Sequence, residues 1–81
     1  MTVKELISQL KELDQNRRVF VRGYEGGYGE VNEIHVTEMA LNVHVEWWFG
    51  EHEKASDKHH VKDPGKYDTV NAVVLMSKRE D

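Results

Sequence analysis

The chain has 81 residues, of which 38% are hydrophobic and 32% charged, and its formal net charge is −4. This length suits one domain, residues 1–81, with a thin core that oligomerisation would supplement. The acidic balance disfavours a nucleic-acid polymer as ligand, because a phosphate backbone requires a basic face. The absence of cysteine excludes disulfides, zinc–thiolate sites and thiol nucleophiles.

No apolar run approaches membrane-spanning length, and the first residues lack the pattern of a secretion signal. We therefore expect a cytoplasmic location and no membrane partner.

The N-terminal segment predicts an amphipathic helix over residues 3–13. Thr2 and Glu5 have the spacing of a capping box, in which the threonine caps the helix and the glutamate bonds back to it. Apolar side chains then recur at helical spacing and form a stripe that is expected to pack on the core: Val3, Leu6, Ile7, Leu10 and Leu13.

Four strands are expected after this helix. Residues 17–22 and 30–37 flank a glycine-rich segment, which is typical of an antiparallel hairpin with a longer loop. Residues 40–49 alternate between apolar and mixed positions, and this alternation places Trp47 in the core. Residues 69–77 are almost continuously apolar, which predicts a central strand covered on both faces.

The expected fold is therefore α+β. An N-terminal helix packs on an antiparallel sheet of about four strands, and a long polar loop, residues 50–68, precedes the last strand. One helix of about three turns cannot cover both faces of such a sheet. We therefore expect a homodimer or a higher homo-oligomer, a ligand or the loop itself to cover the second face.

The segment from Gly23 to Glu30 holds four of the six glycines and two of the three tyrosines. Such a segment has two interpretations. In the first, glycine amides cradle an anion, Tyr24 and Tyr28 offer stacking faces, and Arg22 pairs with a phosphate or carboxylate. In the second, the glycines serve a wide turn with positive φ angles, and the tyrosines pack on the sheet edge.

Strand alternation places Trp48 on the mixed face with His44, where it suits either stacking on a planar ligand or a dimer interface. His52, His59 and His60 lie among acidic residues of the 50–68 loop, but without a recognised ligand spacing. They are interpreted as solvated, so no metal site and no cofactor are expected. The serines have no histidine and acid in a recognisable arrangement, and no catalytic residues are assigned.

The motif Gly-Tyr-Glu-Gly-Gly-Tyr, after a capped helix and a strand, resembles a family of small uncharacterised bacterial and phage proteins. The resemblance covers about the first third of the chain. In many of those sequences we expect an aspartate pair after the second tyrosine, where this chain has Gly29 and Glu30. A separate analogy with small acidic phage proteins without catalytic machinery, which often act on host defence, predicts such a role, in the host cytoplasm if the chain is encoded by a phage.

Our leading hypothesis is a non-catalytic module, of the kind of a phage anti-defence sponge, that sequesters a small phosphate- and ribose-containing molecule such as a cyclic nucleotide or an ADP-ribose derivative. Its amides would come from Gly26, Gly27 and Gly29, and Glu25 would hold ribose hydroxyls. The other ligand-binding residues would be Arg22, Tyr24, Tyr28, His44 and Trp48. The alternative is a protein-interaction module that binds a host protein through its acidic surface and the 50–68 loop.

Overall fold

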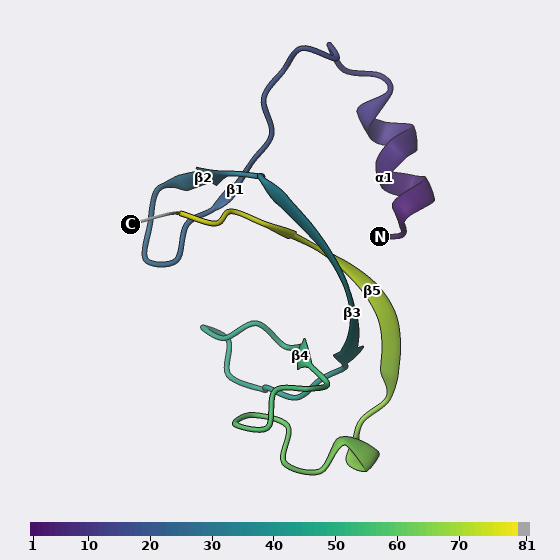
Figure 1. Ribbon diagram of the computed structural model, residues 1–81, viewed down its shortest axis with the longest axis vertical. Coiled ribbons are helices and arrows are strands. Elements are labelled where there is room, and N and C mark those ends of the chain that lie inside the picture. Colours follow the sequence, from purple (N-terminus) through teal and green to yellow (C-terminus); the bar gives the residue numbers. More distant parts are fainter. Residues whose placement is uncertain (80–81) are drawn as a thin grey trace. The chain divides into compact units, whose positions relative to one another are not determined.

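The structure, a computed structural model, describes residues 1–79 and has the expected α+β composition (Figure 1). Along the chain the elements are α1 (Val3–Leu10), β1 (Phe20–Arg22), β2 (Tyr28–Glu30), β3 (Glu33–Ala40), β4 (Glu53–Lys54), the 3-10 helix η1 (Pro64–Lys66) and β5 (Thr69–Met76).

The chain forms two compact units, which we describe separately. The first comprises Met1–His35 and Leu75–Asp81, and the second comprises Val36–Val74.

The strands form two antiparallel sheets instead of the single sheet of about four strands that the sequence predicts. One sheet pairs β1 with β2, and the other has the order β4-β3-β5. In this order β3 is the central strand. The prediction that the last strand lies centrally is therefore wrong: β5 is at the edge of its sheet, and four of its eight residues are exposed.

Three hydrogen bonds made by Asn32 explain why β2 and β3 are separate strands, where the sequence predicts a single strand over residues 30–37. The Asn32 amide N–H donates to the Met76 carbonyl at 3.0 Å. Its side-chain nitrogen donates to the Lys78 carbonyl at 2.7 Å, and its side-chain oxygen accepts from the Lys78 amide at 2.8 Å. Asn32 is thereby committed to the C-terminal segment in the first unit, and the strand is interrupted there.

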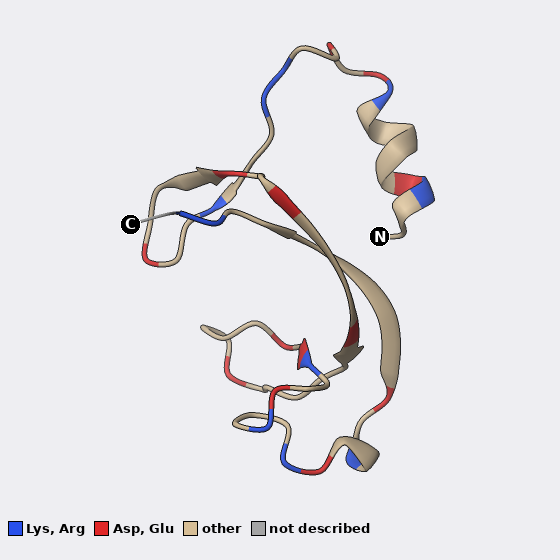
Figure 2. Ribbon diagram, in the orientation of Figure 1, with Lys and Arg blue, Asp and Glu red and all other residues tan. Residues whose placement is uncertain are grey.

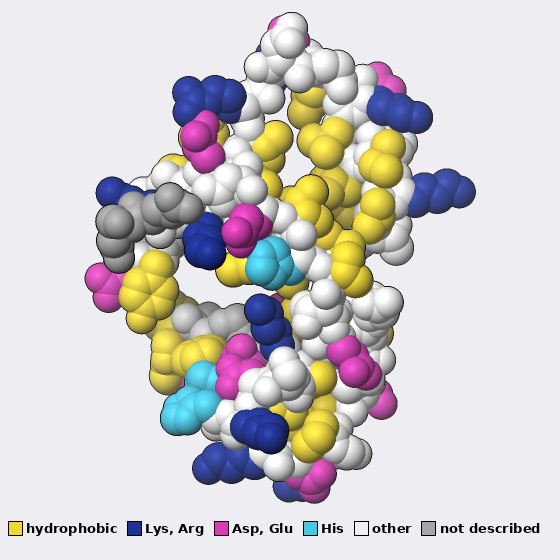
Figure 3. All heavy atoms as spheres, viewed as in Figure 1, with side chains coloured by type: hydrophobic (Ala, Val, Ile, Leu, Met, Phe, Trp, Pro, Cys, Tyr) yellow, Lys and Arg dark blue, Asp and Glu magenta, His cyan; other side chains and the backbone are white. Residues whose placement is uncertain are grey.

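Helix α1 begins as predicted and ends earlier. Both hydrogen bonds of the Thr2–Glu5 capping box are present. At the other end the Gln15 side chain donates to the carbonyls of Leu10 and Leu13, which satisfies groups that a longer helix would pair. Four residues of the apolar stripe are half-exposed, from 40% at Leu10 to 55% at Val3, whereas Leu6 is less exposed. Hydrophobic side chains are visible along α1 in Figure 3. The expected packing of the helix on a sheet stays a prediction.

The strand predicted over residues 40–49 is wrong. Strand β3 ends at Ala40, and Asn42 adopts a left-handed conformation with φ of 56°, which ends the extended backbone. The amides of Val43 and His44 then donate to the carbonyl of Glu51, at 2.7 and 3.0 Å. Trp47, placed in the core by the alternation, is 90% exposed. The predicted polar loop at residues 50–68 contains β4 and η1.

Among residues 1–79, the buried hydrophobic side chains are Ala40 and Val61, both in the second unit. Ala40 lies opposite Glu53 in the β3–β4 pairing. Val61 follows a turn closed by its own amide, which donates to the Asp57 carbonyl at 2.8 Å. These two residues anchor both ends of the segment that contains the acidic and histidine side chains described below.

The position of Gly29 has no room for a side chain, so a larger residue there should destabilise the fold. A Cβ atom at this position would overlap the Oγ and Cβ atoms of Ser77. We expect Gly29→Ala to lower the free energy of unfolding by about 1–3 kcal/mol, the usual range for overpacking. The matched control is Gly50→Ala, because a Cβ there meets nothing within 4 Å. Denaturant unfolding of both variants checks this, and Ser77→Gly added to Gly29→Ala should restore much of the loss. Equal stability of the two glycine variants would contradict it.

The capping box predicts a pH dependence of α1. Hydrogen bonds from Thr2, first its side chain and then its backbone, hold the pKa of Glu5 below its ordinary 4.5. A lowered carboxyl pKa stabilises the folded state above the unfolded-state pKa, and this contribution is lost as the pH falls through the folded-state pKa. We therefore expect helix content to fall below about pH 4.5.

In Thr2→Ala the pKa of Glu5 should rise toward 4.5 and helix content at neutral pH should decrease. Carboxyl NMR titration and far-UV circular dichroism measure the two effects. Glu12→Gln, a change outside the cap, serves as the control. An unchanged pKa of Glu5 in Thr2→Ala would contradict the assignment.

Candidate functional site

The glycine segment forms the turn of the β1–β2 hairpin in the first unit. Arg22 pairs with Tyr28 at the end of the ladder, and the Gly23 amide donates to the Gly27 carbonyl at 3.0 Å. Gly26 and Gly27 have φ angles of 143° and 66°, which favour glycine. A Cβ at Gly23 would overlap the carbonyl oxygen of Gly26. Backbone conformation or lack of space therefore explains why glycine occupies each of these three positions, as the turn interpretation predicts.

The tyrosines do not pack on the sheet edge, contrary to that interpretation. Tyr24 is 98% exposed and Tyr28 is 73% exposed. The turn forms an open depression of about 370 Å³. It is lined by Gly23 and by six of the predicted ligand-binding residues: Arg22, Tyr24, Glu25, Gly26, Gly27 and Tyr28. The hairpin thus offers two exposed phenol rings beside a guanidinium group.

The other two predicted ligand-binding residues, His44 and Trp48, belong to the second unit. Trp48 is 67% exposed, whereas the His44 side chain is 12% exposed and bonded to Glu53. They are not part of the lining of the hairpin depression.

Residues 43–51 form a closed turn that we call the indole loop. The Glu51 carbonyl accepts from the amides of Val43 and His44, and the Phe49 amide donates to the Glu46 carbonyl at 3.2 Å. Val45 and Trp47 at its tip are 93% and 90% exposed. The two indole rings meet edge to face with centroids 5.8 Å apart. Main-chain hydrogen bonds therefore hold a set of large apolar side chains in solvent.

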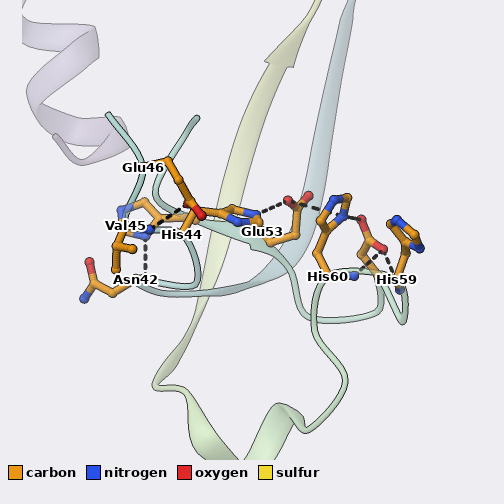
Figure 4. A network of polar contacts seen from close by, with 9 residues as sticks. Asn42, His44, Val45, Glu46, Glu53, His59 and His60 are labelled. Atoms are coloured by element: carbon orange, nitrogen blue, oxygen red, sulfur yellow. Dashed lines mark hydrogen bonds and ion pairs between the residues drawn. The ribbon is translucent and has the colours of Figure 1, made fainter. Parts of the chain in front are cut away.

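A second arrangement in this unit links two histidines through carboxylates (Figure 4). His44 Nε2 lies 2.8 Å from Glu53 Oε2, and His60 Nδ1 lies 3.8 Å from the same oxygen. His60 Nδ1 is also 3.1 Å from Asp57 Oδ2. Glu53 lies between the two imidazole rings in Figure 4. We call Glu53, Asp57 and His60 the acid–histidine cluster.

Backbone structure positions each member of this cluster. Glu53 is on β4, opposite Ala40, and the Asp57 amide donates to the Lys54 carbonyl at 3.0 Å. Asp57 Oδ1 accepts from the His59 amide at 3.0 Å. The His60 side-chain hydrogen bond is the main cause of a lowered Asp57 pKa, partial burial opposes it, and the amides of His59 and His60 lower it further. Asp57 is therefore an ionised acceptor at neutral pH.

Sequence reasoning missed this cluster, because it treated residues 50–68 as a solvated loop. The usable signal was composition alone: Glu53, Asp57 and His60 lie within eight residues, but their spacing has no helical meaning because Glu53 is on β4. His52, placed in the same group by the sequence, lies elsewhere: its Nδ1 accepts from the Asn42 amide at 2.9 Å.

Comparisons of the chain with protein-family models, with curated proteins and with solved structures find no match. The family resemblance of the Gly-Tyr-Glu-Gly-Gly-Tyr motif therefore stays a prediction. Within residues 1–79, no helix has both the length and the apolar character needed to cross a bilayer.

Proposed function

We propose that this chain is a non-catalytic protein-interaction module that binds a basic surface of a partner protein through the indole loop. The observation that carries the proposal is the exposure of Val45, Trp47 and Trp48, at 93%, 90% and 67%, on a loop closed by its own hydrogen bonds. Tryptophans anchor protein interfaces, and a pre-shaped loop loses less conformational entropy on binding.

Charge selects the kind of partner. Residues 41–53 contain three glutamates, Glu46, Glu51 and Glu53, and no lysine or arginine. Figure 2 shows acidic positions on this stretch before the lysine of β4. The rest of the 50–68 loop brings balancing lysines, so negative charge concentrates beside the indoles. Arginine and lysine side chains suit this surface, because they stack on indole faces and pair with carboxylates.

Calorimetric titration with an arginine-rich synthetic peptide tests this proposal. We expect binding that weakens as salt is raised, since charge attraction is screened. Trp47→Ala should weaken binding about tenfold or more, as for an interface anchor. Glu51→Gln should give a smaller loss together with a weaker salt dependence. A glutamate-rich peptide of equal length should not bind.

The matched control is Tyr28→Ala, which removes an exposed aromatic side chain from the hairpin of the other unit. It should bind the arginine-rich peptide as the parent chain does. Equal affinity for both peptides, or no loss in the Trp47→Ala/Trp48→Ala double variant, would contradict the proposal. If that double variant instead turns a dimer into a monomer in native mass spectrometry, the loop's partner is a second copy, and the proposed basic partner is wrong.

The second candidate function is the sequestration of a phosphate- and ribose-containing molecule by the hairpin, in the manner of an anti-defence sponge. The specific observation in its favour is the depression of about 370 Å³ between Arg22 and the exposed Tyr24 and Tyr28. This volume falls within the range of small-molecule sites. The guanidinium group would pair with a phosphate and the phenol rings would stack on a base.

Native mass spectrometry of the chain with a pool of cyclic dinucleotides and ADP-ribose derivatives tests this candidate. The expected result is an adduct that Tyr24→Ala abolishes. Because Tyr24 is 98% exposed, this substitution should change the free energy of unfolding by less than about 0.5 kcal/mol. Trp48→Ala serves as the control from the other unit. An adduct of unchanged intensity in Tyr24→Ala would contradict the candidate, and the same spectra record the oligomeric state.

A further inference from the structure

We propose that Glu53, Asp57 and His60 bind a divalent transition-metal ion, and that Zn²⁺ is the ion which this donor set suits best. The proposal goes beyond the interaction function, because it concerns another group of side chains and requires no protein partner. It rests on the positions of three donor atoms, on their exposure and on the hydrogen bond from His44.

The donor atoms have the spacing of ligands around one ion. Zinc binds histidine nitrogen and carboxylate oxygen at about 2.0–2.2 Å, so neighbouring ligands of a tetrahedral ion lie about 3.4 Å apart. The distances from His60 Nδ1 to Asp57 Oδ2 and to Glu53 Oε2, 3.1 and 3.8 Å, bracket this value. All three donor atoms lie within 4.8 Å of one another.

The exposure of the three side chains allows an ion to enter. Their exposed fractions are 22% for Glu53, 31% for Asp57 and 35% for His60. They are held in a turn yet still reach solvent, so water can complete the coordination as a fourth ligand. Two carboxylates and a neutral imidazole also match the charge of a divalent cation.

His44 acts as a positioning residue. Its Nε2 is 2.8 Å from Glu53 Oε2, and its side chain is 12% exposed. The His44 ring packs against Phe49 with centroids 4.2 Å apart. With the proton on Nε2, His44 donates to the glutamate and directs its carboxylate toward His60. Partners of this kind orient metal ligands in many zinc sites.

Binding requires a rearrangement of one proton. His60 Nδ1 lies 3.1 Å from Asp57 Oδ2, an ordinary hydrogen-bond distance, so without an ion the Nδ1–H group donates to this carboxylate. To coordinate through Nδ1, the neutral imidazole moves this proton to Nε2, and the ion takes the place of the Nδ1 hydrogen. The ring stays neutral, so the exchange balances without an added base.

Calorimetry with ZnCl₂ on the full chain tests the site. We expect a micromolar or lower Kd and one ion per chain. His60→Gln and Asp57→Asn should each weaken binding by about 100-fold or more, since each removes a ligand. His44→Gln should weaken it about tenfold, as for an orienting partner, while a tetrahedral Co²⁺ absorption spectrum is retained. Mg²⁺, which requires octahedral oxygen coordination, should not compete with Zn²⁺.

The chain offers two matched controls. His35→Gln breaks a similar pair, His35 Nε2 and Glu33 Oε2 at 2.8 Å, in the other unit. His59→Gln removes the imidazole next to His60 in sequence. Both should bind Zn²⁺ within about twofold of the parent chain, and circular dichroism should show that every variant is folded. A millimolar Kd for the parent chain, an unchanged Kd in His60→Gln, or an equal loss in His35→Gln would overturn the proposal.

Discussion

The second unit depends on the pairing of two-residue β4 with the end of β3. This pairing sets Glu53 opposite the buried Ala40 and Lys54 opposite Met39. The Ala55 amide extends it by donating to the Glu38 carbonyl at 3.0 Å. Because both ends of residues 41–52 are held there, the chain between them closes into the indole loop. The same ladder fixes the first member of the acid–histidine cluster, so one short backbone contact positions two different surfaces.

The first unit illustrates how a suggestive motif can have a structural cause. Gly26 and Gly27 have positive φ angles, while Gly23 and Gly29 lie where a Cβ atom would overlap a neighbouring atom. Turn geometry and close packing therefore account for all four glycines without a ligand. What remains unexplained by folding is the pair of exposed tyrosines. The case for a ligand at this hairpin depends on those two rings and on Arg22.

Local sequence signals predicted the parts of the fold whose cause is local. The capping box of Thr2 and Glu5, the turn at the glycines and the last strand all appear in the structure. The strand predicted over residues 40–49 was wrong. An alternating pattern shows which side chains are apolar, but it does not show whether another strand pairs with the backbone. In the structure the backbone turns at Asn42 instead. The acid–histidine cluster was not predicted, because the position of Glu53 depends on the pairing of β4 with β3. A strand of only two residues has no recognisable pattern in the sequence. The single domain expected from length stays a prediction beside the two compact units.

The indole loop holds its shape through main-chain groups: one carbonyl, that of Glu51, accepts two amides, and a second carbonyl accepts a third. None of these bonds uses the side chains of Val45, Trp47 or Trp48. Selection can therefore exchange the three exposed side chains without refolding the chain. In this respect the loop is comparable to the variable loops of a recognition scaffold, in which a constant backbone presents changing side chains.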